Sequence, residues 1–227
     1  MSGIAESLTE VRERIRATCT RVGRDPAEVT LVAVSKTVGA DAIREAWAAG
    51  ARVFGENHVA ELEAKARALA DLEGIEWHLI GHLQRNKVKA LVHAELVHSV
   101  DSVRLVEALA TRTRPGGQRV LVQVSLAGEE QKSGAPSGEV AGILDSTART
   151  GGLVRAEGLM TMPPLTASLE DARPIFRRLR ALRDELGGPE KLPHLSMGMS
   201  HDFEAAIEEG ATLVRVGTAI FGARPVG

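Results

Sequence analysis

Short apolar runs alternate with longer amphipathic stretches along the chain. The run VTLVAVS at residues 29–35 is almost entirely apolar, as expected of a strand that is covered on both faces. Runs of this kind predict eight strands, over residues 29–35, 52–55, 76–80, 96–100, 119–126, 154–162, 194–197 and 212–216. The stretches between them predict helices over residues 40–49, 57–72, 84–93, 102–113, 137–150, 168–186 and 201–209.

This alternation of strand and helix predicts a parallel sheet, because parallel strands need a crossover connection. Eight such units favour a closed (β/α)8 TIM-like barrel, which accounts for residues 1–227 as a single α/β domain. No helix is expected after the last strand, and an amphipathic N-terminal helix over residues 6–22 is expected to cover that side. Its apolar face carries Leu8, Val11, Ile15 and Cys19. The alternative is an open doubly wound sheet, but no G-x-G-x-x-G motif follows the first strand.

The charge and composition of the chain narrow the classes of function. Lys and Arg number 28 against 30 Asp and Glu, and this net charge of −2 argues against a general nucleic-acid or membrane-surface binder. No apolar stretch is long enough for a membrane span, and residues 1–10 lack the apolar core of a signal peptide, so a cytoplasmic protein is expected. Cys19 is the one cysteine, which excludes an intramolecular disulfide. Tyrosine is absent, so no mechanism can use a tyrosine of this chain.

Lys36 is the first candidate for chemistry. In a barrel of this type the active site lies at the carboxyl ends of the strands, and Lys36 directly follows the first apolar run. Surroundings of low dielectric constant disfavour the ammonium form, which makes a lysine amine more nucleophilic and suits Schiff-base formation. The alternative is that Lys36 simply leaves the barrel into water.

The last two strands predict an anion site. The segment VRVGTAIFG at residues 214–222 runs from a strand into Gly217 and Thr218, and a glycine there lets the backbone approach a ligand closely. Ser200 follows the seventh strand and precedes a helix, whose N-terminus attracts anions. Barrels frequently bind phosphate with the loops after strands seven and eight, so these two loops form a candidate phosphate site. Two tight glycine turns without a ligand are the alternative.

Arg215 lies within the last apolar strand, where an arginine is rarely left unpaired. It either bonds a carboxylate in a structural role or faces the ligand, and the sequence favours neither. A lysine amine, a phosphate site and an arginine in one barrel mouth together suit pyridoxal 5′-phosphate (PLP). This cofactor needs a Schiff-base lysine, a phosphate anchor and a partner for its pyridine nitrogen.

Other polar clusters predict no further ligand. His78 and His82 have the spacing of metal ligands on a helix, but they straddle a strand end and have no acidic or cysteine partner at a matching interval. No metal site is therefore expected. The basic side chains of the helix over residues 168–186 form a solvated face, and with aromatic residues at 3% no nucleic-acid partner is expected.

Five segments in chain order carry a family resemblance: LVAVSKT (31–37), FGENHVAE (54–61), WHLIGHLQRNK (77–87), GLMTM (158–162) and HLSMGMSHDFEAAIEEGATLVRVGTAIFG (194–222). They resemble the pyridoxal phosphate homeostasis proteins, which are relatives of the N-terminal barrel of alanine racemase. Any one of these motifs is short, but five in order are specific. The resemblance implies a barrel of fold type III among PLP-binding proteins.

The resemblance also implies a role for each candidate residue. Lys36 would hold PLP as a Schiff base, Arg215 would face the pyridine nitrogen, and Asn57 would lie near the ring. The implied phosphate-binding residues are Ser200, Gly217 and Thr218. A permanently charged guanidinium beside the pyridine nitrogen disfavours its protonation, which makes the ring a weaker electron sink.

By resemblance, the function is intracellular PLP homeostasis with an influence on amino-acid and keto-acid balance, without robust catalytic activity. PLP-dependent apoenzymes are the implied partners, and a monomer is expected. The alternative is a PLP-dependent amino-acid racemase that uses Lys36 as its one base. Racemases with this arrangement add a second domain whose tyrosine is the other proton carrier, and this chain has no tyrosine.

Overall fold

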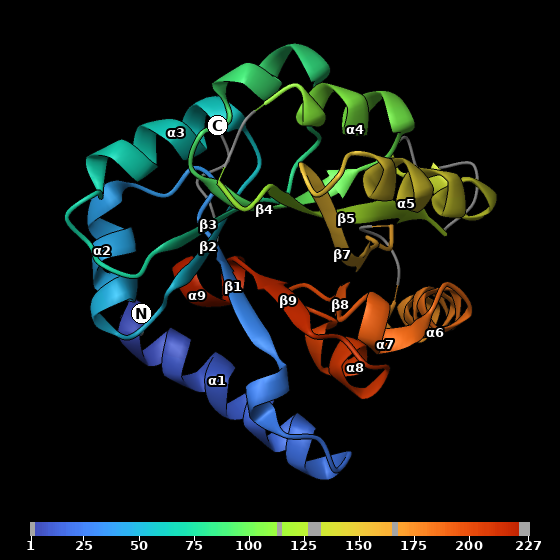
Figure 1. The fold of residues 1–227 in the computed structure, drawn as a ribbon. Coiled ribbons are helices and arrows are strands. Elements are labelled where there is room, and N and C mark those ends of the chain that lie inside the picture. The colour runs from blue at the N-terminus through green and yellow to red at the C-terminus, as the bar shows by residue number, and fades with distance from the viewer. Residues whose placement is uncertain (1–2, 113–114, 127–132, 165–167, 223–227) are drawn as a thin grey trace.

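Eight parallel strands form a closed barrel with helices around it (Figure 1). The computed structural model describes residues 3–112, 115–126, 133–164 and 168–222. The barrel strands are β1 (Thr30–Val34), β2 (Val53–Glu56), β3 (Glu76–Leu79), β4 (Ala94–Val100), β5 (Gln118–Ser125), β7 (Val154–Met160), β8 (His194–Ser196) and β9 (Leu213–Val216). The predicted (β/α)8 TIM-like barrel is therefore confirmed.

The order of the strands brings the two ends of the sequence together. β1 lies between β2 and β9, and the pairing of β4 with β5 closes the ring. Val32 is opposite Arg215, and Val34 is opposite Gly55. Because all these strands are parallel, their carboxyl ends meet at one edge, and the loops after them form the mouth of the barrel.

Alternating side chains divide the apolar core into two parts. One cluster lies inside the ring and contains Val32, Leu96, Leu121, Met160 and Leu213. The larger cluster joins the outward faces of the strands to the surrounding helices. The strands are thus buried on both faces, which explains why they appear in the sequence as nearly continuous apolar runs.

The main helices follow the strands in the predicted order: α2 (Ala40–Ala48), α3 (Val59–Ala68), α4 (Val103–Ala110), α5 (Val140–Arg149), α6 (Leu169–Glu185) and α8 (Phe203–Glu208). The N-terminal helix α1 (Ile4–Arg21) packs against α2 and α8, and its residues Leu8, Val11, Ile15 and Cys19 are buried. The expectation that this helix covers the open side is confirmed. Thr113, the last residue of the helix expected over 102–113, lies outside the described residues.

The prediction of an α-helix over residues 84–93 is wrong. The segment forms a 3₁₀-helix, η2 (Arg85–Ala90), before β4 begins at Ala94. Val88 is the buried residue of η2, and Leu91, directly after it, is also buried. A spacing of three residues fits a 3₁₀-helix and an α-helix alike, so the apolar pattern did not distinguish them.

The last strand is followed by a short helix, α9 (Thr218–Phe221), where none was expected. Ile220 of α9 is buried, and α9 packs against α1, so both helices cover this side. Three short elements were not predicted: η1 (Pro26–Glu28), β6 (Ala135–Pro136) and α7 (Gly188–Lys191). They are too short for a periodic pattern to develop. The helix predicted over residues 137–150 begins with a 3₁₀ turn, η3 (Ser137–Glu139), before α5.

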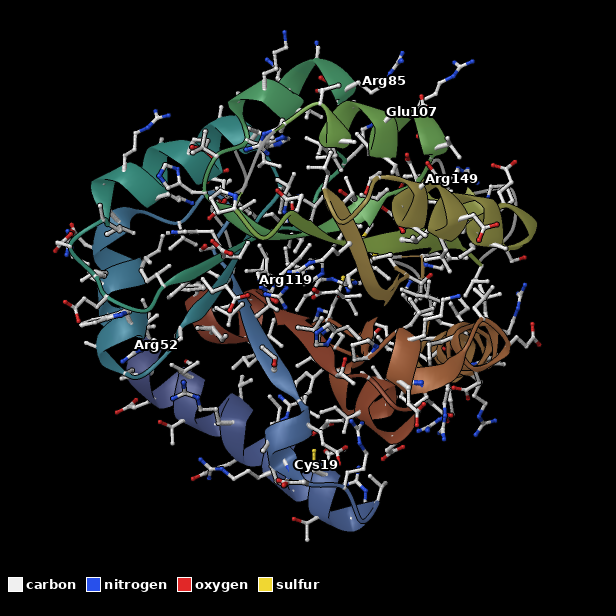
Figure 2. All side chains as sticks on the ribbon, viewed as in Figure 1. Cys19, Arg52, Arg85, Glu107, Arg119 and Arg149 are labelled. Atoms are coloured by element: carbon white, nitrogen blue, oxygen red, sulfur yellow. The ribbon has the colours of Figure 1, made fainter. Side chains whose placement is uncertain are left out.

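Charged side chains are distributed mainly over the outer surface. Figure 2 shows Arg85, Glu107 and Arg149 on the outer elements, whereas Arg119 lies toward the middle of the ring. Within the described ranges, no helix has the length and apolar character needed to cross a bilayer.

Candidate functional site

Lys36 stands at the mouth of the barrel, two residues beyond the end of β1. Lys36 lies in the turn that follows the strand. Val32 is fully buried inside the ring, whereas Lys36 is half-buried. Lys36 therefore stands at the carboxyl end of β1, next to a dry interior and with partial access to solvent.

Two hydrogen bonds from α3 fix the backbone on either side of Lys36. The Lys65 ammonium donates to the Ser35 carbonyl oxygen at 2.6 Å. The backbone N–H of Thr37 donates to Glu61 Oε1 at 2.6 Å, and the same oxygen accepts a bond from Lys65 at 2.7 Å. The position of Lys36 is thus held by tertiary contacts and not by the strand alone.

Glu56 contacts both Ser35 and Lys65 beneath the loop. The side chain is fully buried at the end of β2, and its Oε1 accepts bonds from Ser35 Oγ at 2.6 Å and from Lys65 at 2.8 Å. Burial raises the pKa of Glu56, while the bonds from Lys65 and Ser35 act in the opposite direction. Its Oε2 atom has no hydrogen-bond partner among the described residues.

Thr37 has a strained backbone next to Lys36. Its φ is 65°, and within the described ranges it is the only non-glycine residue with positive φ. A β-branched residue in this region costs about 1–3 kcal/mol and persists only where the surroundings hold it. The bond to Glu61 supplies that constraint.

Arg215 is 3% exposed in the middle of β9. Its Nη1 donates to Ser196 Oγ at 2.6 Å and its Nη2 to the Thr161 carbonyl oxygen at 3.1 Å. Burial lowers the pKa of the guanidinium to about 10, so it remains charged at neutral pH. In the described part of the chain these bonds go to a hydroxyl and a carbonyl oxygen, and no ion pair joins Arg215 to a carboxylate.

The loops after β8 and β9 meet at Ser200 and Gly217. Ser200 Oγ accepts the backbone N–H groups of Gly217 at 3.3 Å and of Ala219 at 3.5 Å. A Cβ on Gly217 would lie 3.2 Å from the Val34 carbonyl oxygen, so this loop also packs tightly against the end of β1. Thr218 is exposed and opens α9, where the first N–H groups have no acceptor within the helix.

Asn57 directly follows β2 and is half-buried. Its backbone touches Gly81, where a Cβ would lie only 2.2 Å from the Asn57 carbonyl oxygen. Both residues line a pocket of about 480 Å³ at the rim together with His58, His82 and Lys87. Within the described residues no hydrogen bond links the Asn57 side chain to the other candidate residues.

The structure therefore places the predicted residues on neighbouring elements. β1 pairs with β9; Lys36 follows β1, Arg215 lies in β9, and Gly217 follows β9 and is bonded to Ser200. Asn57 lies one strand away, after β2. No cluster of three potential metal ligands occurs among the described residues.

The chain matches the family model described as the alanine racemase N-terminal domain over residues 7–225. It is 47% identical over 224 residues to the pyridoxal phosphate homeostasis protein of Aquifex aeolicus, covering 96% of this chain and 97% of that protein. The chain belongs to the pyridoxal phosphate homeostasis protein family. A second member of that family, from Pseudomonas aeruginosa, is 46% identical over 231 residues. The match covers 100% of this chain and 98% of that protein.

Solved structures agree with this membership. PipY of Synechococcus elongatus, with PLP bound, has a TM-score of 0.81 and 37% identity, covering 96% of this chain and 100% of that chain. A structure described as an unknown protein from Bifidobacterium adolescentis has a TM-score of 0.88 and 36% identity, covering 96% of this chain and 94% of that one. Alanine racemase from Corynebacterium glutamicum, at 21% identity and a TM-score of 0.66, shares the fold over 97% of this chain and 63% of its own.

Several residues around the site were not predicted. Glu61 lies in a quoted motif and is four residues from Lys65, a spacing that favours ion pairs on a helix. Glu56, His98 and Ser196 are polar residues in apolar strands. A polar residue within an apolar run is the sequence signal that could have indicated them.

Proposed function

We propose that this protein binds PLP as a Schiff base on Lys36 and acts in PLP homeostasis. PLP offers an aldehyde, a phosphate and a pyridine nitrogen, each of which needs a different partner. The support from relatives is their printed name and the PLP bound in PipY. The support from this chain is that a lysine, a buried arginine and a pair of bonded serine and glycine loops lie on or directly after three adjacent strands.

The observation that carries the proposal is the placement of these partners on three adjacent strands. β1 pairs with β9, and β9 pairs with β8. The lysine follows β1, the guanidinium lies in β9, and the loops after β8 and β9 are joined through Ser200 and Gly217. In this proposal, a ligand bound at the carboxyl ends of these three strands contacts the amine, the guanidinium and the phosphate site together.

Each residue has a defined task in this proposal. Lys36 supplies the amine for the covalent bond, and Ser200, Gly217 and Thr218 donate hydrogen bonds to the phosphate. Arg215 faces the pyridine nitrogen and disfavours its protonation by like-charge repulsion, and Asn57 borders the ring. PLP bound here supplies a reversible covalent attachment and a weak electron sink, which suits storage and delivery better than carbanion chemistry.

The direct test of binding is a PLP titration followed by absorbance, with wild type compared with Lys36→Ala. The expected result is a visible band that saturates in the wild type and is missing in Lys36→Ala. Lys89→Ala, at an exposed lysine, is the matched control and is expected to behave like the wild type. An equal band in the Lys36→Ala protein would overturn the proposal.

Amino-acid racemisation is the second candidate function, and the shared Lys36 favours it. Incubation of the PLP-loaded protein with single L-amino acids in deuterated water separates the two. We expect no rapid exchange of the α-proton, because the guanidinium of Arg215 makes the ring a weak electron sink, and no racemisation, because this chain also has no tyrosine to act as a second proton carrier. Rapid exchange would favour the enzyme.

The remaining proposals concern the state of the protein in the cell. We propose a monomer of one domain in the cytoplasm that delivers PLP to PLP-dependent apoenzymes and so influences amino-acid and keto-acid balance. A monomeric mass by light scattering and one cooperative unfolding transition are expected. A dimeric mass or two separate transitions would contradict the first two points.

A further inference from the structure

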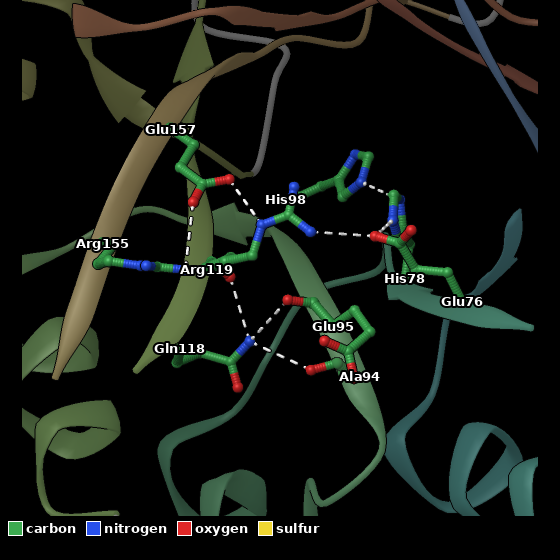
Figure 3. A network of polar contacts seen from close by, with 9 residues as sticks. All are labelled: Glu76, His78, Ala94, Glu95, His98, Gln118, Arg119, Arg155 and Glu157. Atoms are coloured by element: carbon green, nitrogen blue, oxygen red, sulfur yellow. Dashed lines mark hydrogen bonds and ion pairs between the residues drawn. The ribbon is translucent and has the colours of Figure 1, made fainter. Parts of the chain in front are cut away.

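A continuous hydrogen-bonded chain of side chains runs through the barrel from Arg215. Arg215 Nη1 lies 2.6 Å from Ser196 Oγ, and Ser196 Oγ lies 2.8 Å from His98 Nδ1. His98 Nε2 lies 2.9 Å from His78 Nδ1, and His78 Nε2 lies 3.0 Å from Glu76 Oε1. Figure 3 shows the part of this chain that contains the two imidazoles and Glu76.

This hydrogen-bond chain connects the site to the opposite end of the barrel. Arg215, Ser196, His98 and His78 are all buried. Glu76 is the first residue of β3, and its side chain is 36% exposed. The polar path therefore begins beneath the mouth and ends at solvent near the amino ends of the strands.

The two end groups and the neutral state of the imidazoles together determine the direction of every hydrogen bond. A guanidinium can only donate and a carboxylate can only accept. The Glu76 carboxylate accepts from His78 Nε2–H. Burial favours neutral imidazoles, so His78 Nδ1 accepts from His98 Nε2–H, and His98 Nδ1 accepts from the Ser196 hydroxyl, whose oxygen accepts from Arg215. In this arrangement both imidazoles are Nε2–H tautomers.

The charge states of these groups are consistent with that direction. Burial lowers the pKa of His98 well below its ordinary value, and burial also lowers the pKa of His78 although Glu76 opposes this. The bond from His78 holds the pKa of Glu76 below its usual range. Glu76 also accepts from Arg119 at 3.1 Å, which favours the carboxylate at the far end (Figure 3).

The aligned bonds have an electrostatic consequence for Arg215. Each hydroxyl or imidazole turns its negative end toward the guanidinium and its positive end toward Glu76. Such a chain polarises cooperatively, and in a low-dielectric interior it stabilises a charge that has no carboxylate in contact. Ser196 and the Thr161 carbonyl oxygen also fix the plane of the guanidinium from two sides.

We propose that Ser196, His98 and His78 are positioning residues, which orient and polarise Arg215 through a one-way hydrogen-bond chain that ends at Glu76. Through Arg215 they set the affinity for PLP and the electronic state of its ring. This last step rests on the proposed function, whereas the chain itself is a property of the protein without ligand.

The direction of the hydrogen-bond chain can be tested in the protein without PLP. Long-range proton–nitrogen correlation spectra of protein with isotope-labelled histidine report the tautomer of each imidazole. The variants His98→Gln and His78→Gln assign the two signals among the 7 His by their disappearance. We expect Nε2–H for both residues at neutral pH. An Nδ1–H tautomer or an imidazolium at either position would overturn the one-way chain.

The effect on the site is tested with Ser196→Ala and its conservative partner Ser196→Thr. Loss of one buried hydrogen bond to a charged group predicts PLP binding weaker by roughly tenfold to a hundredfold in Ser196→Ala, with a shifted absorbance band. Ser196→Thr retains the hydroxyl and is expected to restore the wild-type band. The control is Ser146→Ala, which removes a buried hydroxyl in α5, an element that contributes no residue to the hydrogen-bond chain.

The outcomes separate the two proposals. If wild-type protein fails to bind PLP, the proposed function fails, and the tautomers still test the chain. If wild type binds PLP and Ser196→Ala matches it in both affinity and absorbance, the positioning role is refuted. Should Ser196→Ala not fold, which circular dichroism would reveal, His98→Gln provides the same comparison of affinity and absorbance.

Discussion

The ammonium nitrogen of Lys65 lies 2.6 Å from the carbonyl oxygen of Ser35, the residue directly before Lys36. The same nitrogen lies 2.8 Å from the buried carboxylate of Glu56 and 2.7 Å from Glu61. One side chain from α3 therefore joins the end of β1, the end of β2 and its own helix. The position of Lys36 depends on this junction.

Replacement of Lys65 by methionine should destabilise the fold and weaken PLP binding. The change leaves Glu56 buried without its cation, and breaking a buried pair in this way costs about 3–5 kcal/mol. Urea unfolding at neutral pH measures the free-energy difference, and a PLP titration measures the loss of affinity. Lys89→Met, at an exposed lysine, should change stability by no more than about 0.5 kcal/mol. Equal effects of the two substitutions would contradict the role of Lys65.

Glu56→Gln should remove one component of the pH dependence of stability. Burial raises the pKa of Glu56 in the folded protein above its ordinary value. The contribution of Glu56 to the free energy of unfolding is therefore fully present below the ordinary carboxyl pKa. It is lost as pH rises through the raised pKa of the folded protein. Urea unfolding of both proteins at pH about 5 and about 8 gives the difference in unfolding free energy, wild type minus variant. This difference should fall with pH, and a rise would mean that the charged form of Glu56 is the favoured one.

Two glycine-to-alanine substitutions should have opposite effects. A Cβ at Gly81 would lie 2.2 Å from the Asn57 carbonyl oxygen, so Gly81→Ala must displace the loop after β2 and should cost about 1–3 kcal/mol. Gly142, in α5, has open space around its Cβ position, so Gly142→Ala should stabilise by about 0.5–1 kcal/mol. Thermal unfolding of both variants checks the signs. A neutral Gly81→Ala would show that the two loops are not in contact.

Periodicity predicted the barrel because every strand is buried on both faces and every main helix has one apolar face. It failed where an element is only about one turn long, as for α9, and it could not tell the 3₁₀-helix η2 from an α-helix, because residues three apart share a face in both. The position of Ser200 beside Gly217 follows from the order of the strands, so it was predictable. The anchor made by Lys65 was not, because it depends on how α3 packs across two strands.

Ser200→Ala should weaken PLP retention by roughly tenfold, because it removes one hydroxyl donor to a charged phosphate and one acceptor that organises Gly217. Equilibrium dialysis of PLP against wild type and variant measures the change. Ser137→Ala, at an exposed serine in η3, is the control and should bind as the wild type does. Unchanged affinity in Ser200→Ala would remove Ser200 from the phosphate site.

The proposed covalent bond between PLP and Lys36 can be trapped by borohydride reduction and located by peptide mass mapping. Reduction fixes a Schiff base as a stable adduct on the lysine that formed it. We expect the pyridoxyl mass on the peptide that contains Lys36 and no comparable labelling in Lys36→Ala. Labelling of another lysine, with Lys36 unmodified, would contradict the proposed bond.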